Sequence, residues 1–287
     1  MIELKNSLRK WFYACRDRYD LRRNIIRKST VKPSPVPDGY QIQPPDFIGI
    51  GAQKAGTSWW HELITSHPEV YDGMHMVGQV SPSYKRKEHH FFNRFCKQEF
   101  TDEDALDYSR WTARPNGMLA GEFTPVYLPK HWSALLIKKS APNARLLVML
   151  RDPIDRFVSG MRQMARQMPK LTALDAEVHY YRGLYCRQLQ AWLRVFPRSQ
   201  LLILQYEKCK LDPATELRRT FDFIGLDCRS SSSFNFKKKI NRTFNKKSFS
   251  LGETHRRSLV ESYRDDVKQL LETFPEIDGS LWKHFDD

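Results

Sequence analysis

Three short apolar runs, each beside a segment with helical spacing, constrain the fold of this 287-residue chain more than any other feature. The runs are residues 47–50, 145–150 and 200–204. Each has the length of a strand, and none alternates regularly between apolar and polar residues. Near-continuous apolar strands are typical of a parallel sheet with helices on both faces. The sequence therefore predicts an α/β domain with a central parallel sheet flanked by helices.

Helical spacing follows or precedes each run. It covers residues 57–65 after the first run, about 154–168 after the second, and about 184–195 before the third. Ligands of such sheets bind beyond the carboxyl ends of the strands. We therefore expect the functional residues directly after the first two runs.

A Pro-rich stretch, residues 31–45, divides the chain into two predicted parts. Residues 1–30 hold nine Lys or Arg against three Asp or Glu, and their apolar residues recur at helical spacing. This pattern predicts a basic amphipathic helix that lies on an anionic membrane or docks on its own domain. The predicted organisation is an N-terminal extension with linker, residues 1–45, and a domain, residues 46–287.

Composition excludes several classes of protein. Hydrophobic residues make up 40% of the chain, which is too many for a disordered protein. No apolar run reaches the roughly 18 residues of a membrane span. The five Cys residues are scattered, which argues against a disulfide scaffold or a zinc site and predicts a cytoplasmic location. The net charge of +14 favours an anionic partner such as a nucleotide, a nucleic acid, an acidic polysaccharide or a lipid surface.

The segment 51–58, between the first run and its helix, has the composition of a phosphate-binding loop. Its small residues Ala55 and Gly56 let the backbone approach an anion, and Thr57 and Ser58 add hydroxyl donors. Nucleotide hydrolases have a Lys where this chain has Thr57, whereas here the Lys lies inside the loop, as Lys54. The loop therefore predicts binding of a 5′-phosphate and argues against ATP or GTP hydrolysis.

Arg151 directly follows the second run, and Ser159 lies eight residues later, about two turns into the next helix. An Arg fork and a hydroxyl that converge on one site suit a second phosphate group.

Together, the segment 51–58 and the Arg151–Ser159 pair resemble the sulfotransferase family. The first resembles the loop that binds the 5′-phosphosulfate, and the second resembles the motif that binds the 3′-phosphate. The resemblance implies 3′-phosphoadenosine 5′-phosphosulfate as donor and a single domain. The basic segment 236–247 is the candidate for the family's late loop, with Arg242 and Lys246 as donor contacts.

Two further segments resemble the heparan sulfate branch of that family. They are Lys-Glu-His-His-Phe-Phe at 87–92 and Glu-Phe-Thr-Pro-Val-Tyr at 122–127. The resemblance implies a carbohydrate or glycolipid acceptor, with Glu88 as general base. Sulfuryl transfer also needs a cation at the leaving group, and we assign Lys54 to it.

The acceptor side has several candidate residues. Lys87 and His89 are candidate acceptor contacts, and Glu122 is either an acceptor contact or an orienting group. The adjacent residues His89 and His90 are rival bases. Four Trp residues are candidates for stacking on sugar rings or for the core: Trp59, Trp60, Trp111 and Trp132.

Other functions stay open at this stage. The acceptor hydroxyl could belong to a small molecule or a lipid. A P-loop kinase is a second alternative, which the missing Lys after Gly56 disfavours. A basic module that binds nucleic acid or a membrane would explain the positive charge but not the phosphate loop. The preferred interpretation has no nucleic-acid partner and no metal, because no His, Cys or Asp cluster has the spacing of zinc ligands.

Overall fold

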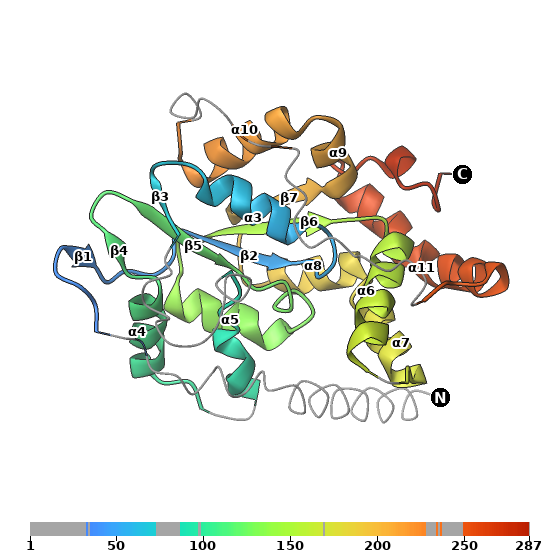
Figure 1. Ribbon diagram of the computed structural model, residues 1–287, viewed down its shortest axis with the longest axis horizontal. Helices are drawn as coiled ribbons and strands as arrows, with labels where there is room; N and C mark the ends of the chain where they lie inside the picture. The colour runs from blue at the N-terminus through green and yellow to red at the C-terminus, as the bar shows by residue number, and fades with distance from the viewer. Residues whose placement is uncertain are drawn as a thin grey trace.

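The computed structural model describes residues 33, 35–72, 87–96, 99–168, 170–227, 234, 236 and 249–286. Within these residues, five parallel strands form one sheet in the order β3-β5-β2-β6-β7 (Figure 1). The strands are β2 (Phe47–Gly51), β3 (Val70–Tyr71), β5 (Leu119–Phe123), β6 (Arg145–Leu150) and β7 (Leu201–Gln205). The predicted central parallel sheet is confirmed.

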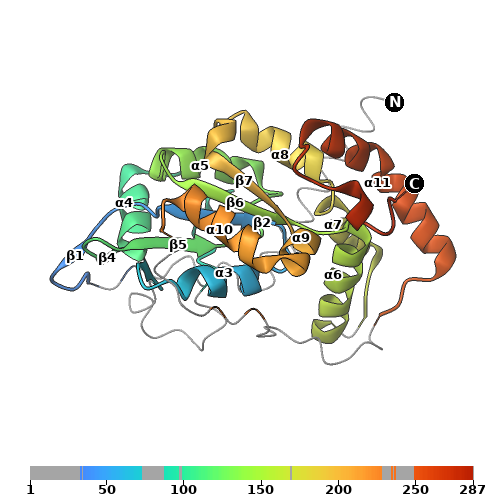
Figure 2. The ribbon, with the colours of Figure 1, turned by 90° about the horizontal axis from the view of Figure 1, so that it is seen from above.

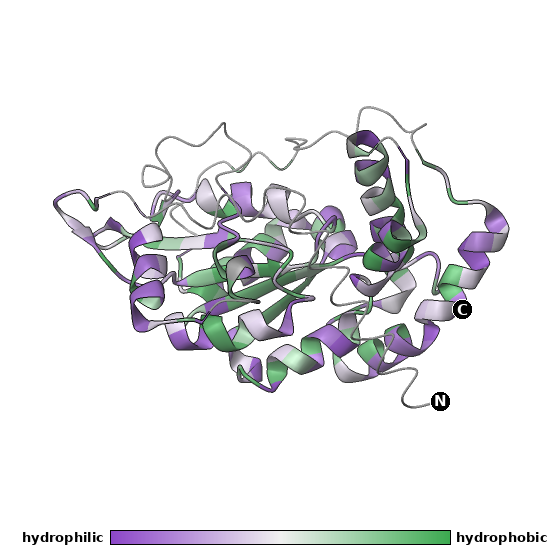
Figure 3. Cartoon of the chain, turned by 90° about the horizontal axis from the view of Figure 1, so that it is seen from below, coloured by the Kyte–Doolittle hydropathy of each residue, from purple (hydrophilic) through white to green (hydrophobic). Residues whose placement is uncertain are grey.

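The two central strands lie inside the molecule because their side chains are apolar on both faces. All residues of β2 are buried, and so are those of β6 after its first residue. Figure 3 shows the same pattern, with hydrophobic strands inside and hydrophilic helix surfaces outside. Continuous burial explains why these strands lack the alternation of a half-exposed sheet.

Helices cover both faces of the sheet (Figures 1 and 2). One face carries α3 (Thr57–Thr65), α9 (Tyr206–Leu211) and α10 (Pro213–Ile224), and the other carries α5 (His131–Ser140) and α8 (Tyr185–Leu193). On the first face, Trp60 Nε1 donates to Thr220 Oγ1 at 3.0 Å and joins α3 to α10. On the second, Trp192 Nε1 on α8 donates to the backbone oxygen of Leu128 at 3.0 Å.

A third group of helices stands at one end of the sheet: α6 (Pro153–Gln167), α7 (Ala173–Tyr181) and α11 (Glu253–Thr273) (Figure 1). The start of α6 is fixed by Asp152, whose Oδ1 accepts from the backbone N–H of Ile154 at 2.8 Å and of Asp155 at 3.1 Å. Pro153 occupies the first helical position, where its missing N–H costs nothing.

The predicted bounds of α3 and β6 are confirmed, and the other predicted elements differ from the structure by one or two residues at their ends. The strand predicted at 200–204 is β7, which begins one residue later because Gln200 ends the short helix η4 (Arg198–Gln200). The helix predicted at 184–195 is the shorter α8.

The end of the predicted linker packs against the domain. β1 (Tyr40–Gln41) pairs with β4 (Arg114–Pro115), the strand after α4 (Asp102–Trp111). Arg114 Nη1 donates to the backbone oxygen of Pro44 at 3.0 Å, and Arg114 Nη2 lies 2.8 Å from Asp46 Oδ2. The division at residue 45 stays a prediction, and the amphipathic segment 1–30 lies outside the described residues. Among the helices that are described, none is both long and apolar enough for a bilayer.

Candidate active site

The loop that joins β2 to α3, residues 51–58, has the backbone of an anion site. Gly56, the N-cap of α3, has a φ of +98°, a left-handed conformation that favours glycine. A Cβ at this position would lie 2.6 Å from Cδ2 of Tyr206, so the loop also packs closely on that ring. The described first turn of α3 contains no acidic side chain and no side-chain cap. The helix N-terminus therefore keeps the partial positive charge that favours a bound anion.

Cationic side chains converge on this loop. Burial lowers the pKa of Lys54, and the charge of Arg166 lowers it further. The charges of Arg151 and Lys87 act in the same direction, while that of Glu88 opposes them. These four cations repel one another, and an anion bound among them would relieve the repulsion.

Arg151 follows β6 and lies against the same loop. Its Nη1 is 3.5 Å from the backbone oxygen of Lys54, and its guanidinium lies 5.1 Å from the centre of the Tyr206 ring. Its Nε is buried without a hydrogen-bond partner in the described part of the chain. A buried donor without a partner is costly, so this N–H fits an oxyanion. Ser159, half-buried, lies two turns further along α6.

The ammonium of Lys87 connects the Glu88 segment to this loop. Its Nζ donates to Thr57 Oγ1 at 2.9 Å and to Ser58 Oγ at 3.1 Å. An ammonium has only donors, so both hydroxyls accept from it and keep their own protons for another acceptor. The sequence predicts that Lys87 contacts the acceptor, and this contact stays a prediction. In the structure, its charge lies at the loop 51–58.

Glu88 is ionised and partly accessible, with 32% of its side chain exposed. Its Oε1 lies 3.6 Å from Lys87 Nζ, and its Oε2 lies 3.2 Å from His90 Nε2. Burial by itself would raise the pKa of Glu88, but the hydrogen bond from His90 and the charge of Lys87 prevail and lower it to about 2. A partly accessible, ionised carboxylate beside an anion-binding loop can accept a proton from a hydroxyl that reaches it.

The two neighbouring His residues have different surroundings. The ring of His89 is buried and lies edge-on to Trp111, with 5.5 Å between ring centres. The ring of His90 faces Glu88 on one side and Asn93 on the other, with Asn93 Nδ2 3.1 Å from His90 Nδ1. The predicted contact between His89 and the acceptor stays a prediction.

Glu122, at the end of β5, is 0% exposed and accepts hydrogen bonds from the protein at both oxygens. Its Oε1 accepts from Tyr108 at 2.9 Å and from Tyr127 at 3.1 Å. Its Oε2 accepts from Thr124 Oγ1 at 2.5 Å and from the backbone N–H of His89 at 3.2 Å. Burial and the charge of Glu122 raise the pKa values of both Tyr hydroxyls, which keeps them protonated as donors. Of the two roles that the sequence leaves open for Glu122, this geometry favours the orienting group.

Comparison with known proteins identifies the family. Residues 44–280 match the family model described as a sulfotransferase domain.

The chain belongs to the sulfotransferase family.

The curated relatives of this sulfotransferase chain include heparan sulfate enzymes. It is 30% identical over 213 residues to heparan sulfate glucosamine 3-O-sulfotransferase 3B1 of Mus musculus. The aligned residues cover 68% of this chain and 50% of the relative. The human 3B1 protein is 28% identical over 268 residues, 84% of this chain and 64% of the relative. The chain thus spans between half and two thirds of these two relatives.

Solved structures show the same fold. A sulfotransferase from Alicyclobacillus acidocaldarius aligns with a TM-score of 0.61 at 22% identity, over 84% of this chain and 100% of that chain. At this level of identity the likeness concerns the fold alone.

The sulfotransferase fold brings most of the predicted site residues together. The segment 51–58, the Lys87–Glu88 pair and Arg151 are linked by the contacts above. Arg242 and Lys246 lie outside the described residues. The described residues contain no group of three or more His, Cys, Asp or Glu side chains that could hold a metal ion. The cytoplasmic location stays a prediction.

The Trp candidates divide between core and surface. Trp60 and Trp111 are buried, and therefore belong to the core. Trp59 and Trp132 are half-buried, so a sugar ring can reach only these two of the four without rearrangement. Stacking on a sugar stays a prediction.

Three residues of this site were missed by the sequence analysis. Tyr206 packs under Gly56 and Arg151, and Asn93 and Lys130 lie behind His90. Asn93 follows His90 by one helical turn, which is a signal that could have found it. No local sequence pattern identifies Tyr206 or Lys130 as site residues, because both contact the site from distant parts of the chain.

Proposed function

We propose that this protein transfers a sulfuryl group from 3′-phosphoadenosine 5′-phosphosulfate to a hydroxyl of a carbohydrate acceptor. One observation carries the proposal: the ammonium of Lys87 contacts both hydroxyls of the anion-binding loop and lies 3.6 Å from Glu88. The anion-binding loop and the carboxylate of Glu88 therefore lie on either side of the Lys87 ammonium, close to each other. Membership of the sulfotransferase family and the heparan sulfate relatives support the same reaction.

The residues of the site fit the donor at both of its anionic ends. The N-terminus of α3, Thr57, Ser58 and Lys54 hold the 5′-phosphosulfate. The unpaired Nε of Arg151 and the Ser159 hydroxyl hold the 3′-phosphate. Two separate clusters of donors predict that a nucleotide with phosphates at both positions binds better than one with a 5′-phosphate alone.

Sulfuryl transfer needs a base and positive charge at defined places. The donor supplies an electrophilic sulfur whose bond to the bridging oxygen of the nucleotide breaks while the acceptor oxygen bonds to sulfur. Glu88 takes the proton of the acceptor hydroxyl. Lys54 and Lys87 stabilise the negative charge that develops on the departing oxygen. The transition state is loose, so positioning and charge supply most of the rate enhancement.

Lys87 also couples the two halves of the site. A carboxylate with a pKa of about 2 is a weak base, and Lys87 is one cause of that low pKa. An anionic group on the loop attracts the Lys87 ammonium away from Glu88. The pKa of Glu88 then rises, and the carboxylate becomes a better base when the donor is in place.

Transfer of radiolabelled sulfate tests the reaction. We expect product with heparan sulfate oligosaccharides, and loss of product with the variants Lys54→Ala and Glu88→Gln. An exposed Lys on the same domain, changed in Lys210→Ala, serves as the control and should leave the rate unchanged. Transfer that proceeds equally well without Lys54 or Glu88 contradicts the proposed site.

Calorimetry tests the donor site separately. We expect adenosine 3′,5′-bisphosphate to bind about 100-fold more tightly than adenosine 5′-monophosphate, because charge-assisted contacts to a phosphate are worth about 3 kcal/mol. Arg151→Ala should remove most of that difference. Equal affinity of the wild-type protein for both nucleotides would rule out a 3′-phosphate site at Arg151.

A further inference from the structure

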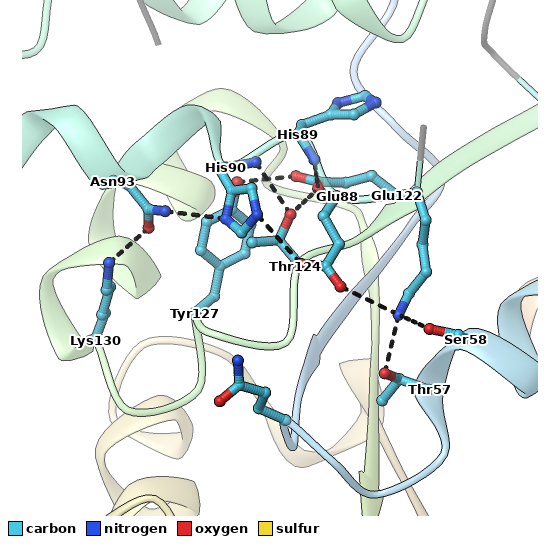
Figure 4. A network of polar contacts seen from close by, with 12 residues as sticks. Thr57, Ser58, Glu88, His89, His90, Asn93, Glu122, Thr124, Tyr127 and Lys130 are labelled. Carbon is cyan, nitrogen blue, oxygen red and sulfur yellow. Dashed lines mark hydrogen bonds and ion pairs between the residues drawn. The ribbon is translucent and has the colours of Figure 1, made fainter. Parts of the chain in front are cut away.

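A chain of hydrogen bonds extends from Glu88 into the protein (Figure 4). His90 Nε2 lies 3.2 Å from Glu88 Oε2, and Asn93 Nδ2 lies 3.1 Å from His90 Nδ1. Lys130 Nζ donates to Asn93 Oδ1 at 2.8 Å. The four side chains come from two parts of the fold: the segment that enters η3 (Phe91–Cys96) and the turn before α5.

The chemistry of Lys130 sets the direction of every bond in this chain. An ammonium can only donate, so it must face the oxygen of the Asn93 amide. The amide nitrogen then faces His90, and because this nitrogen can only donate, His90 Nδ1 must accept. The ring proton is therefore on Nε2, from which it is donated to Glu88. The opposite orientation of the amide would direct two donors at each other beside Lys130.

Burial makes this direction hard to reverse. Lys130 is 3% exposed and Asn93 is 7% exposed, so water cannot readily replace a lost partner. The backbone around Lys130 is also fixed, since its N–H donates to the backbone oxygen of Tyr127 at 2.7 Å and its oxygen accepts from Ser133 at 2.9 Å. The Lys130 side chain thus begins from a rigid turn.

His90 itself is held in an uncommon conformation. Its φ is +54°, which is rare outside glycine and persists where surrounding contacts impose it. Its backbone N–H donates to Thr124 Oγ1 at 3.2 Å, and its ring bonds to Glu88 and Asn93. The fold therefore fixes both the backbone and the ring of His90.

We propose that Lys130 is a positioning residue for the proposed sulfuryl transfer: through Asn93 it holds His90 as the neutral tautomer with the proton on Nε2, which directs a hydrogen bond at Glu88. The proposal rests on the proposed function for its catalytic consequence. It also removes His90 from the candidate bases, because a His90 Nε2 that carries a proton cannot take one from an acceptor. Glu88, whose carboxylate faces that proton, is the proton acceptor of the proposed reaction.

Four charged groups lie around His90. Glu88 and Lys87 lie on its own segment, Lys130 lies behind Asn93, and the buried Glu122 holds the backbone N–H of the preceding residue. A second ring proton, on Nδ1, would point at the NH₂ of Asn93, which cannot accept it.

The first test is Lys130→Met, which keeps the length of the side chain and removes its donors. We expect kcat to fall about 10-fold, the value of one hydrogen bond in a buried network, with the KM for the sulfuryl donor unchanged within about twofold. Lys139→Met, an exposed Lys of α5, is the matched control and should keep full activity. An unchanged kcat in Lys130→Met would overturn the proposal.

The second test observes the tautomer directly and does not depend on activity. In protein labelled at the histidine nitrogens, NMR should show a protonated Nε2 and an unprotonated Nδ1 for His90 across neutral pH. Lys130→Met should give a mixture of both tautomers. A wild-type spectrum with the proton on Nδ1 overturns the proposal. If the NMR spectrum is as expected but the protein transfers no sulfuryl group, the tautomer proposal stands and only the proposed function is refuted.

A third variant avoids dependence on the folding of Lys130→Met. In Asn93→Asp, a carboxylate accepts from both Lys130 and His90 Nδ1, so the ring can carry two protons at low pH and only the Nδ1 proton at high pH. Nε2 then loses its hydrogen bond to Glu88 as pH rises. We expect kcat of this variant to gain an alkaline limb that the wild-type profile lacks. Matching profiles for the two proteins would contradict the role of the Asn93 amide.

Discussion

At the residue scale, the candidate active site consists of charges that modify one another. Lys87 contributes to the low pKa of Glu88, and the repulsion among Lys54, Lys87 and Arg151 adds to the effect of burial on Lys54. The pKa values of Lys54, Lys87 and Glu88 all lie below their usual values. A substitution at one of them therefore alters the others, and the clearest tests use variants that keep the shape of the side chain.

The first such variant is Glu88→Gln, which keeps the size of the side chain and removes the base. We expect kcat to fall by about 10²–10⁴-fold, the usual contribution of a positioned base, with little change in the affinity for adenosine 3′,5′-bisphosphate. Glu261→Gln, an exposed carboxylate on α11, is the control. If Glu88→Gln keeps more than a tenth of the wild-type kcat, the base lies elsewhere, and His89 becomes the next candidate.

A second residue-scale prediction concerns pH and stability. Burial, together with the charges of Lys87 and His89, lowers the pKa of His61 from 6.5 to about 3. The unfolded chain then binds a proton more readily than the folded one, so stability is lost as pH falls from about 6.5 towards 3. We expect His61 to contribute a slope of about 1.4 kcal/mol per pH unit in that window.

Urea unfolding of the wild type and of His61→Gln at a series of pH values measures that slope. The difference in unfolding free energy between the two proteins should change steadily through the window. A difference that stays constant with pH would mean that His61 binds a proton equally well in the folded and the unfolded chain.

At the element scale, the loop 51–58 depends on the Tyr206 ring that packs against it. Gly56→Ala places a methyl group against Tyr206 and forces Ala into a left-handed conformation. Gly117→Ala shares the positive φ, +82°, but its methyl group meets open space. We expect Gly117→Ala to cost about 1 kcal/mol of stability and Gly56→Ala distinctly more, with a loss of nucleotide affinity in Gly56→Ala alone. Equal melting temperatures for the two variants would contradict the close packing on Tyr206.

The turn that carries Arg151 depends on the C-terminal segment. His284 Nδ1 lies 2.8 Å from Asp152 Oδ2, and Arg256 Nη1 lies 2.9 Å from His284 Nε2. Because Arg256 can only donate, the proton of His284 is on Nδ1 and is donated to Asp152. This bond holds the first turn of α6 from outside, next to Arg151.

We therefore expect His284→Ala to weaken binding of adenosine 3′,5′-bisphosphate about 10-fold, the value of one buried hydrogen bond, and to leave adenosine 5′-monophosphate unaffected. His255→Ala, on the exposed side of α11, is the matched control. Calorimetry measures both affinities. Equal weakening of the two nucleotides would show a general loss of structure instead of a displaced Arg151.

At the scale of the whole molecule, the net charge of +14 predicts how acceptors are captured. Positive charge attracts an acidic polysaccharide over distances that salt screens. We expect the KM for an acidic glycan to rise several-fold when salt increases from about 50 to 200 mM, and the KM for an uncharged sugar acceptor to stay constant. Steady-state kinetics with both acceptors check this. A KM for the acidic glycan that does not respond to salt would mean that the charge serves another purpose.

The sequence by itself determined the parts of this protein that depend on short stretches of chain. Continuous apolar runs fix β2 and β6 because both faces of these strands are buried, and the small residues of 51–58 fix the loop before α3. The position of Arg151 follows from the rule that parallel strands end at one edge. Glu88 was also found from a short stretch of chain, because the segment 87–92 resembles a family motif.

Only the tertiary structure decided which of these residues act together. The strand β5 contains Gly121 and Glu122 and has no apolar run, so its place beside β2 came from pairing and not from local pattern. Lys87 meets Thr57 from 30 positions away, and Lys130 meets Asn93 from 37. Side chains so far apart become neighbours only when the sheet order and the helix positions are set. Bringing them together costs conformational entropy, and burial of the whole core, not a local preference, offsets that cost.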